Sequence, residues 1–405
     1  MSKVPLERKG NIVMLPTPSC LTADRDAEAL AALDRAGLPE PAPHAPMPGL
    51  ARKGRGATLN PPVRFETRET EPFDDGWAAP GMPDPPPPLE TTLIRDSSRS
   101  AIAWNESPDI GFDRAVNPYR GCEHGCIYCY ARPSHAYLGY SPGLDFETKI
   151  LFKPEIASLL EREIGRPGYV VRPIALGSNT DPYQPVERRL ALTRAVLETL
   201  ERAGHPLTIV TKSAGVLRDL DILTRLAGRN LARVHVSITT LDPDLARRME
   251  PRASSPARRL EAIGALAGAG VPVGVMAAPM IPGLNDAELE RILAAAAQAR
   301  ARYAAFVLLR LPHELKALFE GWLAEHRPDR ARHVLSLVRQ TREGRLNDPS
   351  FHGRMRGSGP YAGLIAARFA RAAQKYGLAD RPLPLDTSQF VAPGRAAEPR
   401  QLALL

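Results

Sequence analysis

Three of the chain's four cysteines, Cys122, Cys126 and Cys129, lie within eight residues of a 405-residue sequence. Their spacing, three intervening residues and then two, lets one loop bring three thiols around a compact centre. Gly121 and Gly125 permit the backbone turns that such a loop requires. Thiolates are soft ligands that select iron–sulfur clusters, zinc or copper(I). The stretch therefore predicts a metal centre.

Several kinds of centre fit these three thiols. A zinc site could be completed by His124 or His135, although structural zinc usually takes two well-separated pairs of ligands. A four-cysteine iron–sulfur cluster would need Cys20 as its last ligand. Buried thiols without a function are a further alternative. We favour a [4Fe–4S] cluster on three cysteines, with one iron open to a substrate or cofactor.

From about residue 101, apolar runs of strand length alternate with helical patterns. The strand-like runs lack polar alternation, which is typical of strands that are buried on both faces. They span 169–177, 207–212, 233–239, 271–279 and 304–310, and helical patterns cover 187–203, 215–228, 243–249, 255–268 and 286–300. With a first strand before the cysteines, this repetition predicts an α/β fold of six strand–helix units and a parallel sheet. A partial (β/α)6 barrel of the TIM type and an open doubly wound sheet both fit.

Composition divides the chain into segments. Residues 1–100 hold 17 of the 41 prolines and no sustained apolar period, so we expect a largely disordered N-terminal arm. Its first 90 residues should be dispensable for the metal centre. A basic stretch within it, 51–66, either lies along a surface or forms a solvated linker. The remaining segments are a core (101–312), a helical C-terminal extension (313–380) and a tail (381–405).

Composition also excludes some classes of protein. Four cysteines in 405 residues exclude a disulfide scaffold, and no secretion signal pattern is present, so we expect a cytoplasmic protein. The charge-free window 262–284 contains five glycines and three prolines, which favours a buried core segment over a membrane span; we expect no membrane partner. The net charge of +8 suggests a nucleic-acid partner, but arginine outnumbers lysine by 45 to 8, and such a skew often reflects codon composition alone.

Polar residues stand where the predicted strands end. In parallel α/β folds, ligands bind at the carboxyl ends of the strands, so these residues should face the same mouth as the cysteine loop. They are Ser178, Asn179, Thr180 and Asp181 after the second strand, Lys212 at the end of the third, and Ser237 with Thr239 at the end of the fourth. An Asn/Asp-Pro turn with a helix cap is the alternative interpretation for the first group.

The pattern Cys-x3-Cys-x-aromatic-Cys after a first strand, with Tyr128 at the aromatic position, resembles the signature of the radical S-adenosylmethionine (SAM) enzymes. The stretches "GCEHGCIYCYARPSHAYLGYSPGLDFETKI" and "LGSNTDPYQPVE" resemble the spore photoproduct lyase-like branch, also described as DNA-repair-photolyase-related. The resemblance covers roughly residues 110–310 and continues more weakly to about 376.

This resemblance implies a [4Fe–4S] cluster on the three cysteines, whose open iron binds SAM. Reduction by a donor such as flavodoxin or ferredoxin then cleaves SAM, and the resulting 5′-deoxyadenosyl radical abstracts hydrogen from a substrate. The implied SAM contacts are Tyr128 by its backbone, Ser178, Asn179, Thr180, Asp181 for the amino group, Lys212, Ser237, Thr239 and Arg252. The protein's part in such chemistry is to orient the cofactors and exclude water.

This chain departs from the spore photoproduct lyase pattern at the residue that returns hydrogen to the product. Spore photoproduct lyase is understood to use a further cysteine for this step, and this chain has none after Cys129. Tyr130 is the candidate catalytic residue in its place. The leading hypothesis is a radical SAM enzyme that acts on an unidentified substrate, with a nucleic acid as the first choice. The alternatives are a non-catalytic iron–sulfur or zinc protein that binds nucleic acid, and a radical SAM enzyme that acts on a protein or small metabolite.

Overall fold

The computed structural model describes residues 54–65 and 89–394, and its centre is a seven-stranded sheet in the order β10-β9-β8-β7-β6-β3-β2. All neighbouring strands are parallel except β2, which pairs antiparallel with β3 at the edge. The strands are β2 (Ile102–Trp104), β3 (Arg114–Val116), β6 (Ile174–Leu176), β7 (Leu207–Thr211), β8 (Ala232–Ser237), β9 (Val273–Met280) and β10 (Tyr303–Leu308). The predicted partial (β/α)6 barrel is confirmed.

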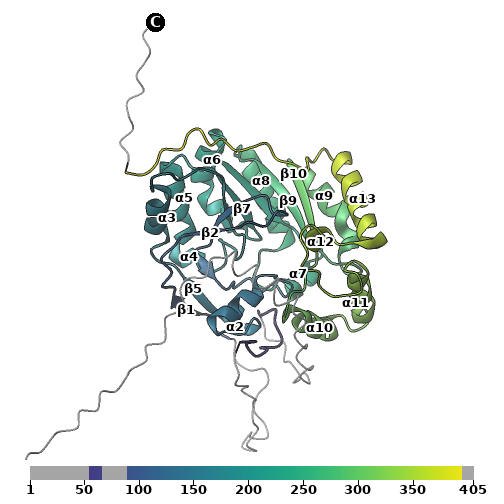
Figure 1. Cartoon of the computed structure of the whole chain (residues 1–405). Helices are drawn as coiled ribbons and strands as arrows, with labels where there is room; N and C mark the ends of the chain where they lie inside the picture. The colour runs from purple at the N-terminus through teal and green to yellow at the C-terminus, as the bar shows by residue number, and fades with distance from the viewer. Residues whose placement is uncertain (1–53, 66–88, 395–405) are drawn as a thin grey trace, which may run out of the picture.

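Helices form an outer layer around these strands (Figure 1). They are α3 (Ile156–Ile164), α4 (Glu187–Leu190), α5 (Leu192–Arg202), α6 (Leu220–Gly228), α7 (Pro243–Met249), α8 (Pro256–Gly268) and α9 (Leu289–Gln298), with the 3-10 helices η2 (Ala214–Asp219) and η3 (Asp286–Glu288). The single helix predicted over 187–203 is two helices, because Ala191 has a φ of +51° and interrupts it. Strand residues such as Ile209, Val234 and Val275 have no exposed surface, as expected for a sheet covered on both faces.

A small second sheet supports the cysteine loop. It has the order β1-β5-β4 and comprises β1 (Thr92–Arg95), β5 (Lys149–Phe152) and β4 (Tyr119–Arg120). The short helix α2 (Leu144–Thr148) leads into β5. The sequence places β1 in the N-terminal arm. The structure differs because this four-residue strand acquires its hydrogen bonds from β5, more than fifty residues further along the chain.

The C-terminal region is helical, with α10 (Leu315–His326), α11 (Ala331–Gln340), α12 (Gly353–Arg356) and α13 (Gly359–Lys375). Residues 381–394, predicted to be tail, run back from α13 across the ends of the barrel helices (Figure 1). In this segment the Val391 N–H donates to the Ala203 carbonyl at 2.9 Å. Phe390 packs edge-on against His205, whose Nε2 lies 2.8 Å from the Tyr169 hydroxyl. The segment therefore belongs to the packed base of the barrel.

None of the helices in the described residues is long and apolar enough to cross a membrane. The charge-free window 262–284 forms the end of α8, a turn and β9, as predicted.

Acid should destabilise this fold through its buried histidines, of which His135 and His205 have no exposed surface. Burial lowers the pKa of His135 and of His205 to about 4, whereas an unfolded histidine titrates near pH ~6.5. Between these values the unfolded chain binds more protons than the folded chain. The free energy of unfolding should therefore fall as the pH decreases from ~6.5 to ~4, by on the order of 3 kcal/mol per ring. Thermal unfolding across this range should show a shallower decline for His205→Gln than for the wild type. Parallel Tm curves would contradict this assignment.

Candidate active site

A short loop at the carboxyl end of β3 and β4 carries the three cysteines. Gly121 and Gly125 in this loop have φ angles of +81° and +66°, which residues with a side chain rarely adopt. A Cβ atom on Gly125 would also lie 2.7 Å from the Glu147 carboxylate, well inside contact distance. The expectation that Gly121 and Gly125 permit these backbone turns is confirmed.

The loop holds three free thiols, of which Cys122 and Cys126 are buried and Cys129 is partly exposed. Burial raises the pKa of Cys122 and of Cys126, so a bound metal would be needed to keep them as thiolates. Within the described residues, no three His, Cys, Asp or Glu side chains converge closely enough to hold a single metal ion. Three thiols on one loop suit a polynuclear centre, in which each thiolate binds a different metal atom.

The two histidines that a zinc site would need have other contacts. Nδ1 of His124 lies 3.3 Å from the Asp181 carboxylate. Nε2 of His135 lies 3.0 Å from the Lys149 carbonyl, and its ring packs edge-on against Phe146. Each of these contacts uses one ring nitrogen, as the outer contact of a metal-binding histidine also does.

Arg132 and Glu147 form a fully buried ion pair beneath the loop. Neither side chain has exposed surface, and Nη2 of Arg132 lies 2.5 Å from Oε1 of Glu147. The same guanidinium donates to the carbonyls of Gly125 (3.1 Å), Cys126 (2.8 Å), Pro142 (3.1 Å) and Gly143 (2.8 Å). One cation thus fixes the backbone between two of the cysteines.

Residues 54–61, the N-terminal strap, lie against the cysteine loop. The backbone N–H groups of Gly56 and Ala57 donate to the two oxygens of the Glu147 carboxylate, at 2.9 and 2.8 Å. A Cβ atom on Gly56 would lie 1.9 Å from the carbonyl oxygen of Gly125, so the two backbones are in contact. The sequence predicts a dispensable arm here. In the structure the strap packs against the loop: the Glu147 carboxylate accepts two of its backbone N–H groups, and Ala57 and Leu59 pack in an apolar cluster.

Gln184 holds the loop from the side of the barrel. Its Nε2 donates to the Gly121 carbonyl at 3.2 Å, and its Oε1 accepts from the Glu123 N–H at 2.9 Å. The side chain is fully buried, so both contacts are made away from water. The loop after β6 and the cysteine loop are therefore fixed relative to each other.

Asp181, predicted to bind the amino group of SAM, links two strand ends instead. Oδ1 accepts from Tyr183 N (2.9 Å) and Thr211 Oγ1 (2.7 Å), and Oδ2 accepts from Lys212 N (2.7 Å) and faces His124 Nδ1 (3.3 Å). Burial alone would raise the pKa of Asp181, but the charge of His124 and these hydrogen bonds outweigh it and lower the pKa to about 2. Its oxygens are occupied by protein donors, so the residue positions Lys212 and His124.

The other three polar residues after β6 differ in their accessibility. Thr180 is buried, and its hydroxyl donates to the Tyr119 carbonyl at 2.9 Å. Ser178 and Asn179 remain partly exposed and both contact Asn117, which donates to the Ser178 hydroxyl and accepts from the Asn179 N–H at 3.2 Å each. Ser178 and Asn179 are therefore accessible to a ligand, whereas Thr180 belongs to the framework.

A second buried carboxylate, Glu250, organises the residues around the motif tyrosine. The hydroxyls of Tyr128 and Thr239 both donate to it, the latter at 2.7 Å. Arg259 forms a buried ion pair with Glu250 and donates to the Ser237 carbonyl at 3.0 Å. The predicted site residues Tyr128, Ser237 and Thr239 are thus brought together, with Thr239 bound into the framework.

Lys212 lies at the same mouth and makes no ion pair in the described part of the chain. Its Nζ is 5.7 Å from the centre of the Tyr128 ring. Burial raises the pKa of Cys126, and the nearby positive charge of Lys212 acts to lower it. Arg252, by contrast, pairs with Glu123 of the cysteine loop at 3.2 Å. Lys212 is therefore the better placed of the two cations to receive a carboxylate.

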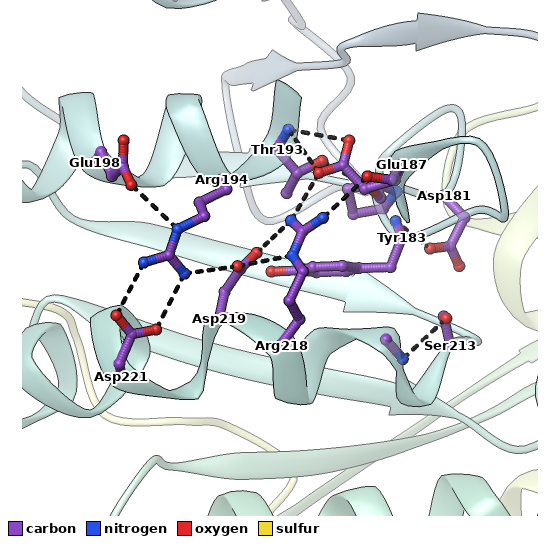
Figure 2. Close-up of polar contacts among 12 residues, drawn as sticks. Asp181, Tyr183, Glu187, Thr193, Arg194, Glu198, Ser213, Arg218, Asp219 and Asp221 are labelled. Carbon is purple, nitrogen blue, oxygen red and sulfur yellow. Dashed lines mark hydrogen bonds and ion pairs between the residues drawn. The ribbon is translucent and has the colours of Figure 1, made fainter. Parts of the chain in front are cut away.

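A network of charged side chains holds the loop that follows β6 against α5 and α6. Figure 2 shows the Arg218 guanidinium between the carboxylates of Glu187 and Asp219, at 2.7 Å from each. Asp219 is fully buried and also accepts from Arg194 at 3.0 Å. Burial alone would lower the pKa of Arg218, but its hydrogen bonds to these carboxylates outweigh burial and raise it. The network fixes the loop that presents Ser178 and Asn179.

Tyr130, the candidate for hydrogen transfer, is half exposed at the mouth. Its hydroxyl donates to the Ser178 carbonyl, and the Arg310 guanidinium lies 5.6 Å from the centre of its ring. Cys20, considered as a fourth ligand, lies outside the described residues.

Comparison with known proteins identifies the family. A family model, "Radical SAM superfamily", matches residues 116–296, which include the cysteine loop and the strand ends up to β9. Uncharacterized proteins of Mycobacterium bovis and Mycobacterium tuberculosis are each 36% identical over 301 residues, covering 73% of this chain and 85% of theirs. The chain belongs to the radical SAM superfamily. Radical SAM enzymes generally use a [4Fe–4S] cluster and SAM, and the residues described above fit both.

Solved structures of spore photoproduct lyase share the fold of this chain. Spore photoproduct lyase in complex with dinucleoside spore photoproduct aligns with a TM-score of 0.52 at 19% identity, covering 71% of this chain and 81% of the lyase. A lyase variant with bound AdoMet and dinucleoside spore photoproduct aligns with a TM-score of 0.51 at 18% identity over the same shares. The expected resemblance to this branch is confirmed at the level of the fold.

Four framework residues of this radical SAM site were missed by sequence reasoning: Arg132, Glu147, Gln184 and Glu250. All four lie within or beside the motifs. A signal for them was available, since each is a long polar side chain in a stretch that folds around a predicted buried centre. Motif spacing does not show which of these side chains point inward.

The Arg132–Glu147 pair yields a prediction. Glu147→Gln keeps the size of the side chain but leaves Arg132 as an uncompensated buried cation, which costs about 3–5 kcal/mol. We expect a lower Tm and an iron content well below that of the wild type after anaerobic reconstitution. Glu155→Gln is the control, because the Arg95–Glu155 pair is largely exposed and worth at most ~1 kcal/mol. Equal iron content in the two variants would remove the support for this organising role.

Proposed function

We propose that this radical SAM enzyme binds a [4Fe–4S] cluster through Cys122, Cys126 and Cys129, binds SAM beside it, and uses the pair to abstract hydrogen from a nucleic-acid substrate. The observation that carries the proposal is a single loop with three thiols, placed at the same barrel mouth as Lys212. The cysteine loop supplies no fourth thiol, which leaves one iron for SAM. When bound, the cluster supplies the electron and the open coordination site, and SAM supplies the 5′-deoxyadenosyl group.

The chain's own residues would bind and orient these groups. Lys212 is the cation best placed for the SAM carboxylate, because it has no acidic partner in the described part of the chain. Ser178 and Asn179 offer partly exposed polar groups on the neighbouring strand end. Asp181 and Thr239 would act indirectly, by holding Lys212 and Tyr128 in place.

Support for a nucleic-acid substrate comes from charge and from the fold. The net charge of +8 favours polyanionic partners, and the fold is that of spore photoproduct lyase, which has been solved in complex with dinucleoside spore photoproduct. A small reductant such as flavodoxin or ferredoxin would supply the electron. Tyr130 is the proposed group for hydrogen return, because it is half exposed at the mouth and precedes no further cysteine.

The ligand assignment predicts a clear difference among the cysteines. Single Ala substitutions of Cys122, Cys126 or Cys129 should abolish the cluster's visible absorbance and lower iron and sulfide content to background, since each removes one of three ligands. Cys20→Ala should retain full absorbance. Loss of iron in Cys20→Ala would show four-cysteine ligation and would remove the open site for SAM.

The SAM assignment predicts an effect on affinity alone. Lys212→Ala should weaken SAM binding about tenfold to a hundredfold, since a charge-assisted hydrogen bond is worth about 1.5–3 kcal/mol and ~1.4 kcal/mol corresponds to one decade. Cluster absorbance should not change. Formation of 5′-deoxyadenosine from SAM and dithionite tests the activity itself. Asp181→Asn is the comparison variant, and it should lower Tm because it disrupts a buried network. Unchanged SAM affinity in Lys212→Ala would refute this placement.

A further inference from the structure

Arg310 stands two residues beyond β10, at the mouth of the barrel, without an acidic partner. One of its terminal nitrogens, Nη1, donates to the Met355 sulfur at 3.7 Å, and its Nε is buried with no hydrogen-bond partner. Among the described residues no carboxylate forms an ion pair with it. Leaving a charged donor buried and unsatisfied costs several kcal/mol, so the unpaired Nε needs an explanation, and a bound anion would supply its missing acceptor.

The surroundings of Arg310 are positively charged. Arg354 lies close by but is paired with Asp109, at 2.7 Å from Nε and 2.5 Å from Nη2. Arg342 is also near, and it donates to the carbonyls of Leu308 (3.3 Å), Leu309 (2.8 Å) and Gly353 (2.8 Å). Burial, followed by the charge of Arg354, lowers the pKa of Arg310 to about 10. The guanidinium therefore stays protonated at neutral pH and remains able to bind an anion.

Two half-exposed aromatic rings flank this group of arginines. Tyr130 of the cysteine loop lies under the Arg310 guanidinium, and Phe351 lies under that of Arg354, at 5.6 and 4.9 Å from ring centre to guanidinium carbon. Each ring is 50% exposed. Arginines beside exposed aromatic rings are the combination by which proteins hold unpaired nucleotides, with the phosphate on the cation and the base on the ring.

We infer that Arg310 binds a backbone phosphate of a single-stranded or unpaired nucleic-acid substrate, with Tyr130 and Phe351 as stacking surfaces for the neighbouring bases. This inference rests on the proposed function and gives it a specific subsite. Because Tyr130 directly follows Cys129, a nucleotide held there lies beside the cysteine loop. The subsite would therefore place the nucleotide next to the position where hydrogen abstraction is proposed.

The test uses the full-length, anaerobically reconstituted enzyme. Binding of a fluorescein-labelled single-stranded DNA and of an RNA of the same sequence is measured by anisotropy at several salt concentrations. Arg310→Gln should weaken binding at least about tenfold and should reduce the salt slope by about one phosphate contact. Arg310→Lys retains the charge and should restore the salt slope and part of the affinity. The exposed Arg371 on α13 supplies the matched control, and Arg371→Gln should bind as the wild type does.

Parallel measurements separate the possible failures. Iron content and Tm of each variant establish that it is folded and loaded. If Arg310→Gln instead weakens SAM binding and leaves oligonucleotide binding unchanged, Arg310 holds the SAM carboxylate and the inference is overturned. If the wild type forms 5′-deoxyadenosine but binds neither oligonucleotide, the phosphate subsite is overturned while SAM cleavage stands. Absence of 5′-deoxyadenosine from the wild type would reject the proposed function itself.

Discussion

The buried ion pair between Arg132 and Glu147 is the interaction on which the arrangement of the site depends. The guanidinium donates to the backbone carbonyls on both sides of the Cys126 side chain, and the carboxylate accepts from two backbone N–H groups of the N-terminal strap. Both charges are completely removed from water, so each is stable only while the other is present. Three chain segments are therefore fixed by a single pair of side chains, and the cysteine loop receives its shape before any metal is considered.

Polar residues at the strand ends divide into two groups. Asp181, Thr180 and Thr239 are saturated by contacts within the protein, whereas Lys212, Ser178 and Asn179 keep part of their polar surface accessible. The saturated group holds the accessible group at fixed positions, which is the relation between supporting and ligand-binding residues that precise sites require.

Sequence reasoning recovered the parallel sheet, the six strand–helix units and the position of the cysteine loop, because long apolar runs and thiol spacing are local signals. It did not recover the strap, β1 or the packed segment 381–394, whose partners lie far away in the chain. It also assigned Asp181 and Arg252 to SAM. A sequence shows where such charged residues stand, but not that four protein donors contact Asp181 or that Arg252, in the loop after α7, pairs with Glu123.

The two edges of the main sheet, β2 and β10, do not pair with each other. The loop that follows β2 instead reaches the C-terminal region through Asp109, which accepts from Arg354 and from the His352 N–H. This seam is made of side-chain contacts and not of a ladder of backbone hydrogen bonds. Separation of β2 from β10 at this seam would therefore break no hydrogen bond between strands. Because the Asp109 and Arg354 side chains are largely shielded from water, salt screens this ion pair less than an exposed one, and the contact should persist at high ionic strength.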